Sequence, residues 1–242
     1  MKMKVIAPDY YQSFRCIAGD CRHTCCRGWE VDIDEESLAR FRALPDIAAH
    51  ISQEGTPHFR LLEGERCPFL NEQNLCRMIL EHGEESLCQI CRDHPRFRNY
   101  WADRTELGVG MVCEEAARLI LSREKPMKMV VLSDDGVPTE LPEEEQWLLD
   151  LREELYARTP GDGPQARLLE YLIYRHIPDA LYDGRVEARI AFVEQSFRQI
   201  TEAWKKTDGS LEALAECARV WSYDVEYDEE EKEKRLCALD ER

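Results

Sequence analysis

The spacing of hydrophobic residues predicts helices in the second half of the chain. Between residues 185 and 204, apolar side chains recur every three or four positions, which is typical of one face of a helix. Similar patterns predict a helix over 165–177 and another after Ser210, whose side chain can cap the first turn. Pro142 followed by three glutamates predicts a further helix start, because the helix dipole favours acids there. The tail from Asp224 is expected to end in a short exposed helix.

The first half has few long periodic segments. Its pattern predicts a short strand over Val31–Ile33, a helix capped by Asp34, helices over 84–92 and 114–122, and a strand over 127–132. We therefore expect a mainly α fold with two regions. A cysteine-rich, metal-bound region with short strands spans residues 1–132 and packs on a helical bundle region that spans residues 133–242.

Composition narrows the classes of function. The 242 residues carry 32 basic and 49 acidic side chains, a net charge of −17, which excludes nucleic acid as the main partner because phosphate binding needs a basic face. Apolar residues at 43% are enough for a core. Neither a signal peptide nor a membrane span is expected, since no apolar run is long enough. We expect a soluble cytoplasmic protein whose oligomeric state the sequence does not define.

The cysteines are the strongest chemical signal. There are 11, and nine of them lie between Cys16 and Cys113. An odd number, crowded together in a cytoplasmic setting, favours a metal site over disulfides. The candidate ligands are Cys16, Cys21, Cys25, Cys26, Cys67, Cys76, Cys88 and Cys91. Thiolates select iron–sulfur clusters or structural zinc, and we favour iron–sulfur, with zinc as the alternative.

Other residues near these cysteines have competing interpretations. Cys113, Cys217 and Cys237 lack a close partner and are expected to be structural, and His23 and His94 could complete a zinc site. Six of the fourteen non-cysteine neighbours of the eight ligands are arginine. Guanidinium groups would offset the negative charge of a thiolate-bound metal, and Arg22 and Arg92 are our candidates for binding a carboxylate-bearing cofactor.

Five segments resemble the flagellin lysine-N-methylase family. They are YYQSFRCIAGDCRHTCCRGWEVDID (10–34), CPFLNEQNLCRMILEHGEESLCQICRDHPRF (67–97), GVGMVCEEAARLIL (108–121), LLEYLIYRHIPDALYDGRVEARIAFV (168–193) and ECARVWSYDVEYDEE (216–230). The cysteine-rich half also resembles the broader zinc- or iron-chelating cysteine-cluster family. Members of the methylase family are typically longer, and this chain departs from them between about residues 132 and 165, where a helical middle segment is missing.

The resemblance implies transfer of a methyl group from S-adenosylmethionine to a lysine ε-amine of a protein, flagellin or similar, with an iron–sulfur cluster, 4Fe-4S in type, involved. It implies the eight cysteines as ligands without saying which four act together. We rank Cys21, Cys25, Cys88 and Cys91 first, because each belongs to a tight CxxxC or CxxC pair. The other four would form a second site or a supporting shell.

Lysine methylation needs a group that accepts or displaces a proton, because the amine is protonated at neutral pH. The catalytic candidates, which lie in one C-terminal segment, are Tyr171, Tyr174, Arg175, Tyr182 and Asp183. The competing interpretation is that these tyrosines only pack the bundle. Two other functions stay open: a non-catalytic iron–sulfur or zinc module with a structural or redox-sensing role, and a different cluster enzyme on the same scaffold.

Overall fold

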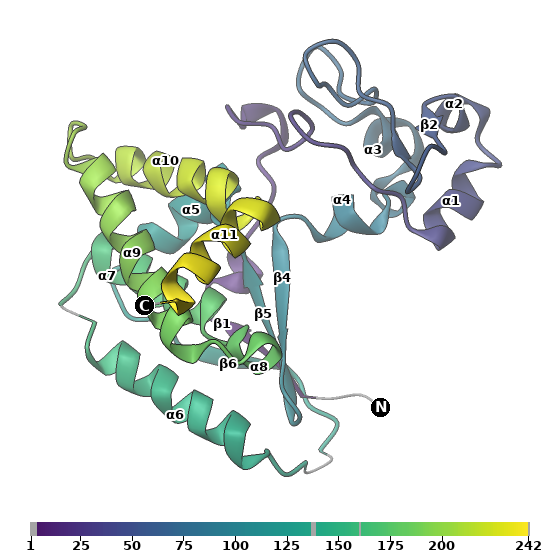
Figure 1. Cartoon of the computed structure of the whole chain (residues 1–242). Helices are drawn as coiled ribbons and strands as arrows, with labels where there is room; N and C mark the ends of the chain where they lie inside the picture. Colours follow the sequence, from purple (N-terminus) through teal and green to yellow (C-terminus); the bar gives the residue numbers. More distant parts are fainter. Residues whose placement is uncertain (1–3, 137–138, 160, 242) are drawn as a thin grey trace. The chain divides into compact units, whose positions relative to one another are not determined.

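The computed structural model describes residues 4–136, 139–159 and 161–241, and it forms two compact units (Figure 1). The cysteine-rich unit is the continuous segment Cys16–His94, and the sheet–helix unit combines the chain up to Arg15 with the chain from Pro95 onward. The predicted boundary after residue 132 falls inside the sheet–helix unit. The reason is that the N-terminal strand pairs with strands that follow the cysteine-rich unit in sequence.

A four-stranded sheet forms one layer of the sheet–helix unit. Its strands, in spatial order, are β4 (Arg96–Tyr100), β5 (Arg104–Val109), β1 (Lys4–Pro8) and β6 (Met129–Ser133). β1 runs parallel to β5, with Lys4 opposite Arg104, and antiparallel to β6. β4 and β5 form a hairpin in which Gly108 lies under the Phe97 ring, where a Cβ atom would come 2.1 Å from Phe97 Cζ. Only glycine fits at this position without a shift of the ring.

Helices form the second layer, and the sequence predicted most of them. They are α5 (Glu114–Leu121), α6 (Glu143–Ala157), α7 (Pro164–His176), α8 (Ala180–Asp183), α9 (Val186–Trp204), α10 (Leu211–Trp221) and α11 (Glu229–Asp240). Ser210 caps α10 as expected, by accepting a hydrogen bond from the Ala213 N–H. α7 lies against the sheet, since Tyr174 donates to the Leu107 carbonyl at 2.8 Å.

The mainly α expectation is confirmed, with one correction in this unit. The strands β1, β4 and β5 were not predicted, so the helices pack on a sheet instead of forming a bundle alone. The C-terminal helix α11 is mostly exposed, as predicted, and its buried Leu236 anchors it to the core of the unit. Across the described residues, no helix has the length and apolar character that a membrane crossing requires.

The cysteine-rich unit is built from short elements. They are α1 (Glu35–Phe41), α2 (Pro45–Ala48), β2 (Ile51–Ser52), β3 (His58–Phe59), α3 (Arg77–His82) and α4 (Gln89–Asp93). Asp34 caps α1 as predicted and also accepts from the Gln89 N–H at 2.8 Å, so one carboxylate joins the starts of α1 and α4. Burial opposes ionisation, but these hydrogen bonds lower the pKa of Asp34 to about 2.

Two predicted elements differ in this unit. The strand expected over 31–33 is a single bridge between Asp32 and His58, because the partner segment is only two residues long. The helix expected over 84–92 is a 3-10 turn, Glu84–Ser86, followed by α4. The two pieces are separated by Leu87 and Cys88, which are extended and buried. The extended backbone at these two residues interrupts the helix.

Candidate metal centre

Cysteine side chains form part of the hydrophobic core of the cysteine-rich unit. Cys67 and Cys88 are buried among Phe41, Phe59 and Phe69, and the rings of Phe59 and Phe69 meet edge to face at 5.0 Å. Three more cysteines, Cys26, Cys76 and Cys91, are partly buried against the same core. This hydrophobic core is small for a segment of this length. A bound metal would therefore add to the stability of the unit.

Backbone hydrogen bonds bring together cysteines that are far apart in sequence. The Cys67 N–H donates to the Cys26 carbonyl at 2.9 Å, which places the two segments side by side. The Cys67 turn closes when the Leu70 N–H donates to the Cys67 carbonyl, and Leu70 bridges to Cys76. Cys76 and Cys88 each directly precede a helix, α3 and α4 respectively. The positions of these thiols are therefore set by backbone hydrogen bonds in the loops and by the starts of two helices.

Five of the thiols lie close enough for the charge on one to raise the pKa of another. Charge on Cys26, Cys76 or Cys88 raises the pKa of Cys67, and charge on Cys26, Cys67 or Cys88 raises that of Cys91. We name these residues the five-thiol cluster: Cys26, Cys67, Cys76, Cys88 and Cys91. All five come from the cysteine-rich unit, so they can be described without reference to the other unit.

Hydrogen bonds and burial divide the five-thiol cluster into two protonation classes. The thiol of Cys25 lowers the pKa of Cys26 to about 7, and the thiol of Cys91 lowers that of Cys88 to about 7. Burial raises the pKa of Cys67 to about 12 and also raises that of Cys76, whereas Cys91 is raised mainly by its hydrogen bond to Cys88. Because thiolates are the ligand form, a bound cation would release protons from the last three.

The residues present fit a thiolate-bound metal centre. All five thiols are soft donors of one unit, and the Cys88 and Cys91 thiols are hydrogen-bonded to each other. Iron–sulfur clusters and zinc both take such donors, so the choice between them stays a prediction.

The remaining predicted ligands lie outside the five-thiol cluster. Cys16 is exposed and accepts from the Ala18 N–H at 3.4 Å, Cys21 is partly buried, and Cys25 is exposed beside Cys26. The structure thus brings Cys26, Cys67 and Cys76 to the Cys88–Cys91 pair, and the Cys25 thiol is hydrogen-bonded to Cys26. The ranking of Cys21 and Cys25 among the first ligands stays a prediction. The apolar CPFL turn around Cys67 was the sequence signal for burial at this site.

The arginines around the cysteines have varied surroundings. Arg66 donates to the carbonyls of Leu70 and Asn71 and so supports the Cys67 turn, and Arg77 pairs with Glu81 at 2.9 Å on α3. Arg22 and Arg92, the predicted cofactor-binding residues, are both exposed side chains of the cysteine-rich unit. Their assignment to a cofactor stays a prediction.

The predicted catalytic residues separate into three groups in the sheet–helix unit. Tyr171 and Arg175 converge on the buried Glu226, at 2.9 Å and 2.8 Å from its Oε1 atom. Tyr174 is fully buried and donates to a sheet carbonyl, which is a packing role. Two others lie away from Glu226: Tyr182 is 67% exposed, and Asp183 pairs with Arg189 at 2.6 Å.

Glu226 is a residue that the sequence reasoning missed. It ends a π-helical turn, Ser222–Glu226, and also accepts a hydrogen bond from the Ser222 hydroxyl at 2.9 Å. Burial raises the pKa of Tyr171 well above its usual value, and the neighbouring Glu226 charge raises it further. π-Helical turns occur frequently at functional sites. In the sequence, the sign of this site was an acidic residue beside two apolar positions at helical spacing, Trp221 and Val225.

Three curated proteins are similar to about half of this chain. A lysine-N-methylase of Salmonella choleraesuis (strain SC-B67) is 27% identical over 143 residues, which cover 53% of this chain and 35% of that protein. A lysine-N-methylase of Salmonella typhimurium (strain LT2) is 26% identical over the same shares. The flagellar biosynthetic protein FliU of Salmonella muenchen is 25% identical over 140 residues, 53% of this chain and 83% of FliU.

These matches confirm the predicted resemblance to the flagellin lysine-N-methylase family as a distant relationship. The matched part spans about a third of the length of the two lysine-N-methylases. No family model and no solved structure matches the chain. The resemblance of the N-terminal half to the cysteine-cluster family therefore stays a prediction.

Proposed function

We propose that this distant relative of the lysine-N-methylases is itself an S-adenosylmethionine-dependent protein-lysine N-methyltransferase. The observation that carries the proposal is its similarity to two proteins named lysine-N-methylase. FliU, named a flagellar biosynthetic protein, supports a flagellar protein such as flagellin as the substrate. We assign the reaction to the cytoplasm, where the methyl donor and newly made substrate would meet.

The five-thiol cluster is our proposed metal centre. Its soft donors suit an iron–sulfur cluster, which we propose to be of the 4Fe-4S type, with zinc as the alternative. Such a group would join the Cys26, Cys67 and Cys88 segments and would add a redox-active centre to the unit. The surrounding residues bury the centre and hold its thiols in place.

Within the sheet–helix unit, Glu226 and its partners are the best-ordered candidates to act on a lysine amine. The substrate ammonium must lose a proton before it can attack a methyl group. The Glu226 carboxylate has 0% side-chain exposure and is already paired with Arg175, so we propose that it acts by positioning Arg175, whose side chain is 17% exposed. We keep Arg22 and Arg92 as the proposed contacts for the carboxylate of the methyl donor, on the basis of charge.

Two measurements separate the enzyme from a non-catalytic metal module. Protein purified without oxygen is expected to contain iron and acid-labile sulfide, whereas zinc without sulfide would contradict the cluster. Calorimetry is expected to show binding of S-adenosylmethionine to this metal-loaded protein. A metal-loaded protein that does not bind the methyl donor would favour the structural or redox-sensing module.

A further inference from the structure

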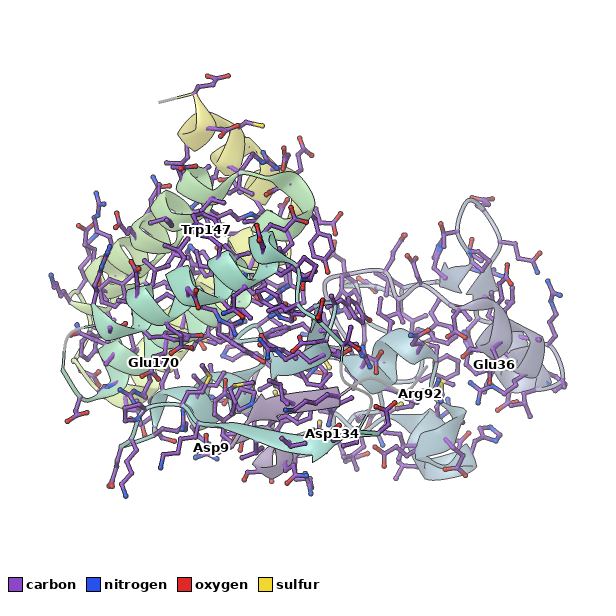
Figure 2. The ribbon with its side chains drawn as sticks, turned by 90° about the horizontal axis from the view of Figure 1, so that it is seen from below. Asp9, Glu36, Arg92, Asp134, Trp147 and Glu170 are labelled. Atoms are coloured by element: carbon purple, nitrogen blue, oxygen red, sulfur yellow. The ribbon has the colours of Figure 1, made fainter. Side chains whose placement is uncertain are left out.

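Trp147, which Figure 2 labels, is an exposed tryptophan in the first half of α6. It lines a groove together with three acidic residues. Trp147 is 54% exposed, whereas the next two residues of the helix, Leu148 and Leu149, are 2% and 9% exposed and belong to the core. The fold therefore does not use the Trp147 ring for its own packing. A large apolar group left in solvent beside a groove is a common feature of interaction surfaces.

Apolar and acidic side chains together line the groove. Its lining residues are Glu140, Leu141, Glu143, Gln146, Trp147 and Asp150. Helical spacing of four and three places Glu143, Trp147 and Asp150 along one exposed face of α6. Leu141 is half-buried beside them, and Gln146 donates to the Asp150 carboxylate at 2.8 Å, which holds that carboxylate in position.

The acids of the groove are not all explained by the helix itself. Glu143, Glu144 and Glu145 lie in the first turn, where the helix dipole favours negative charge. Glu145 has a structural contact, because it accepts from the Ala102 N–H at 2.8 Å. Glu140 precedes the helix and Asp150 lies beyond its first turn, yet both line the same groove.

We propose that this groove docks a lysine-bearing segment of the protein substrate. The aliphatic stem of a lysine would lie on the Trp147 ring and its ammonium would meet the carboxylates of Glu140, Glu143 and Asp150. Charge complementarity selects this partner, since three acids line the groove with Trp147 and the whole chain carries −17. The inference rests on the proposed function for the identity of the partner, but docking can be tested without methyl transfer.

The test measures binding of a dye-labelled lysine–serine peptide to the full-length, metal-loaded protein by fluorescence anisotropy at low salt. The same peptide with acetylated lysines is expected to lose binding, because acetylation removes the charge. Trp147→Ala is expected to weaken binding about five-fold, the size expected for an exposed cation–π contact with part of the lysine stem. Trp147→Leu, which keeps an apolar group, is expected to recover only part of that loss.

A matched pair of double variants separates local docking from general attraction. Glu140→Gln with Glu143→Gln is expected to weaken binding about five-fold, through two exposed charge pairs. Glu229→Gln with Glu230→Gln removes the same charge from exposed residues of α11 and is expected to change binding less than two-fold. Equal losses of peptide affinity in the two double variants would overturn the proposed docking site. Peptide binding that is unaffected by Trp147→Ala would do the same.

Failure of the groove and failure of the proposed function give different results. Methyl transfer that occurs with an unchanged substrate KM in Trp147→Ala would reject the groove and leave the methyltransferase intact. Groove-dependent peptide binding in a protein that methylates no lysine would reject the methyltransferase and leave the docking surface intact. A wild-type protein that does not bind the lysine peptide would reject the groove directly.

Discussion

At the scale of single residues, buried ionisable groups occur as partners of other polar groups in both units. Cys88 and Cys91 illustrate this for the metal centre, because their mutual hydrogen bond sets opposite pKa shifts within one pair. Glu226 illustrates it for the sheet–helix unit, where a carboxylate with 0% side-chain exposure accepts from Tyr171 and Arg175. In both places, removal of one partner leaves the other in an unfavourable environment.

Replacing both Cys88 and Cys91 by alanine is expected to abolish metal binding and to reduce the yield of folded protein. The pair contributes two of the five clustered thiols. Because the hydrophobic core of this unit is small, much of its stability is expected to depend on the bound metal. The control replaces Cys217 and Cys237 by serine in the sheet–helix unit, which should leave the metal content unchanged. Metal analysis that finds full occupancy in the alanine variant would contradict the assignment.

Glu226→Ala is expected to lower the free energy of unfolding by about 2–3 kcal/mol, since it leaves a mostly buried guanidinium without its counter-charge. The Arg175 side chain is 17% exposed, so water replaces only part of the lost interaction. Chemical denaturation monitors the change. A double variant, Glu226→Gln with Arg175→Met, is expected to recover part of the loss. If the single and double variants lose equal stability, the pair is not coupled as described.

At the scale of elements, α7 contains a buried histidine that should make the fold sensitive to acid. His176 is 1% exposed, and its ring lies edge-on to Phe192 and Trp221 at 5.1 and 6.0 Å. Burial lowers the pKa of His176 well below its usual value, and the charges of Arg175, Arg189 and Lys232 lower it further. The His176 ring is therefore neutral in the folded protein.

The pH dependence follows from this shift. The unfolded chain takes up a proton at His176 near pH 6.5 while the folded protein does not, so stability is complete above that pH and falls below it. Between pH 7.5 and 5.5, the wild type is expected to lose about 1.4 kcal/mol more than His176→Phe. Urea denaturation at the two pH values provides the measurement. Parallel losses in the two proteins would show that His176 does not titrate in this way.

The same scale shows why the sequence revealed the helices but not the sheet. α9 and α10 bury one regular face, so their apolar residues recur with helical spacing. In β4 and β5, by contrast, the buried positions include Asn99 and Glu106, which disrupt the apolar alternation. These polar groups are satisfied from distant helices: Asn99 donates to the Tyr174 carbonyl and Glu106 pairs with Arg152 at 2.6 Å. Such partners cannot be identified from local sequence.

The candidate site was predictable only in part for a similar reason. Crowded cysteines indicate a metal site from sequence alone. The membership of the five-thiol cluster depends on the backbone pairing of Cys67 with Cys26, which short spacing does not encode. The contact of Tyr171 and Arg175 with Glu226 likewise joins two distant helical segments.

At the scale of the whole molecule, net charge shapes the encounter with substrate. Forty-nine acidic side chains against 32 basic ones should attract a lysine-rich protein surface from a distance. Salt screens this attraction within about 8–10 Å at physiological ionic strength. The apparent KM for the protein substrate is therefore expected to rise several-fold between about 50 and 300 mM salt, with little change in kcat. A KM that is insensitive to salt would mean that the acidic runs are only solvated helix faces.

The most direct test of the account is mass spectrometry of flagellin after incubation with the metal-loaded protein and S-adenosylmethionine. The account predicts methyl groups on lysine side chains, dependent on the methyl donor and lost with the Cys88→Ala, Cys91→Ala double variant. The Cys217→Ser, Cys237→Ser control should methylate normally. Unmodified lysines, in the presence of an intact metal centre and bound methyl donor, would contradict the proposed methyltransferase.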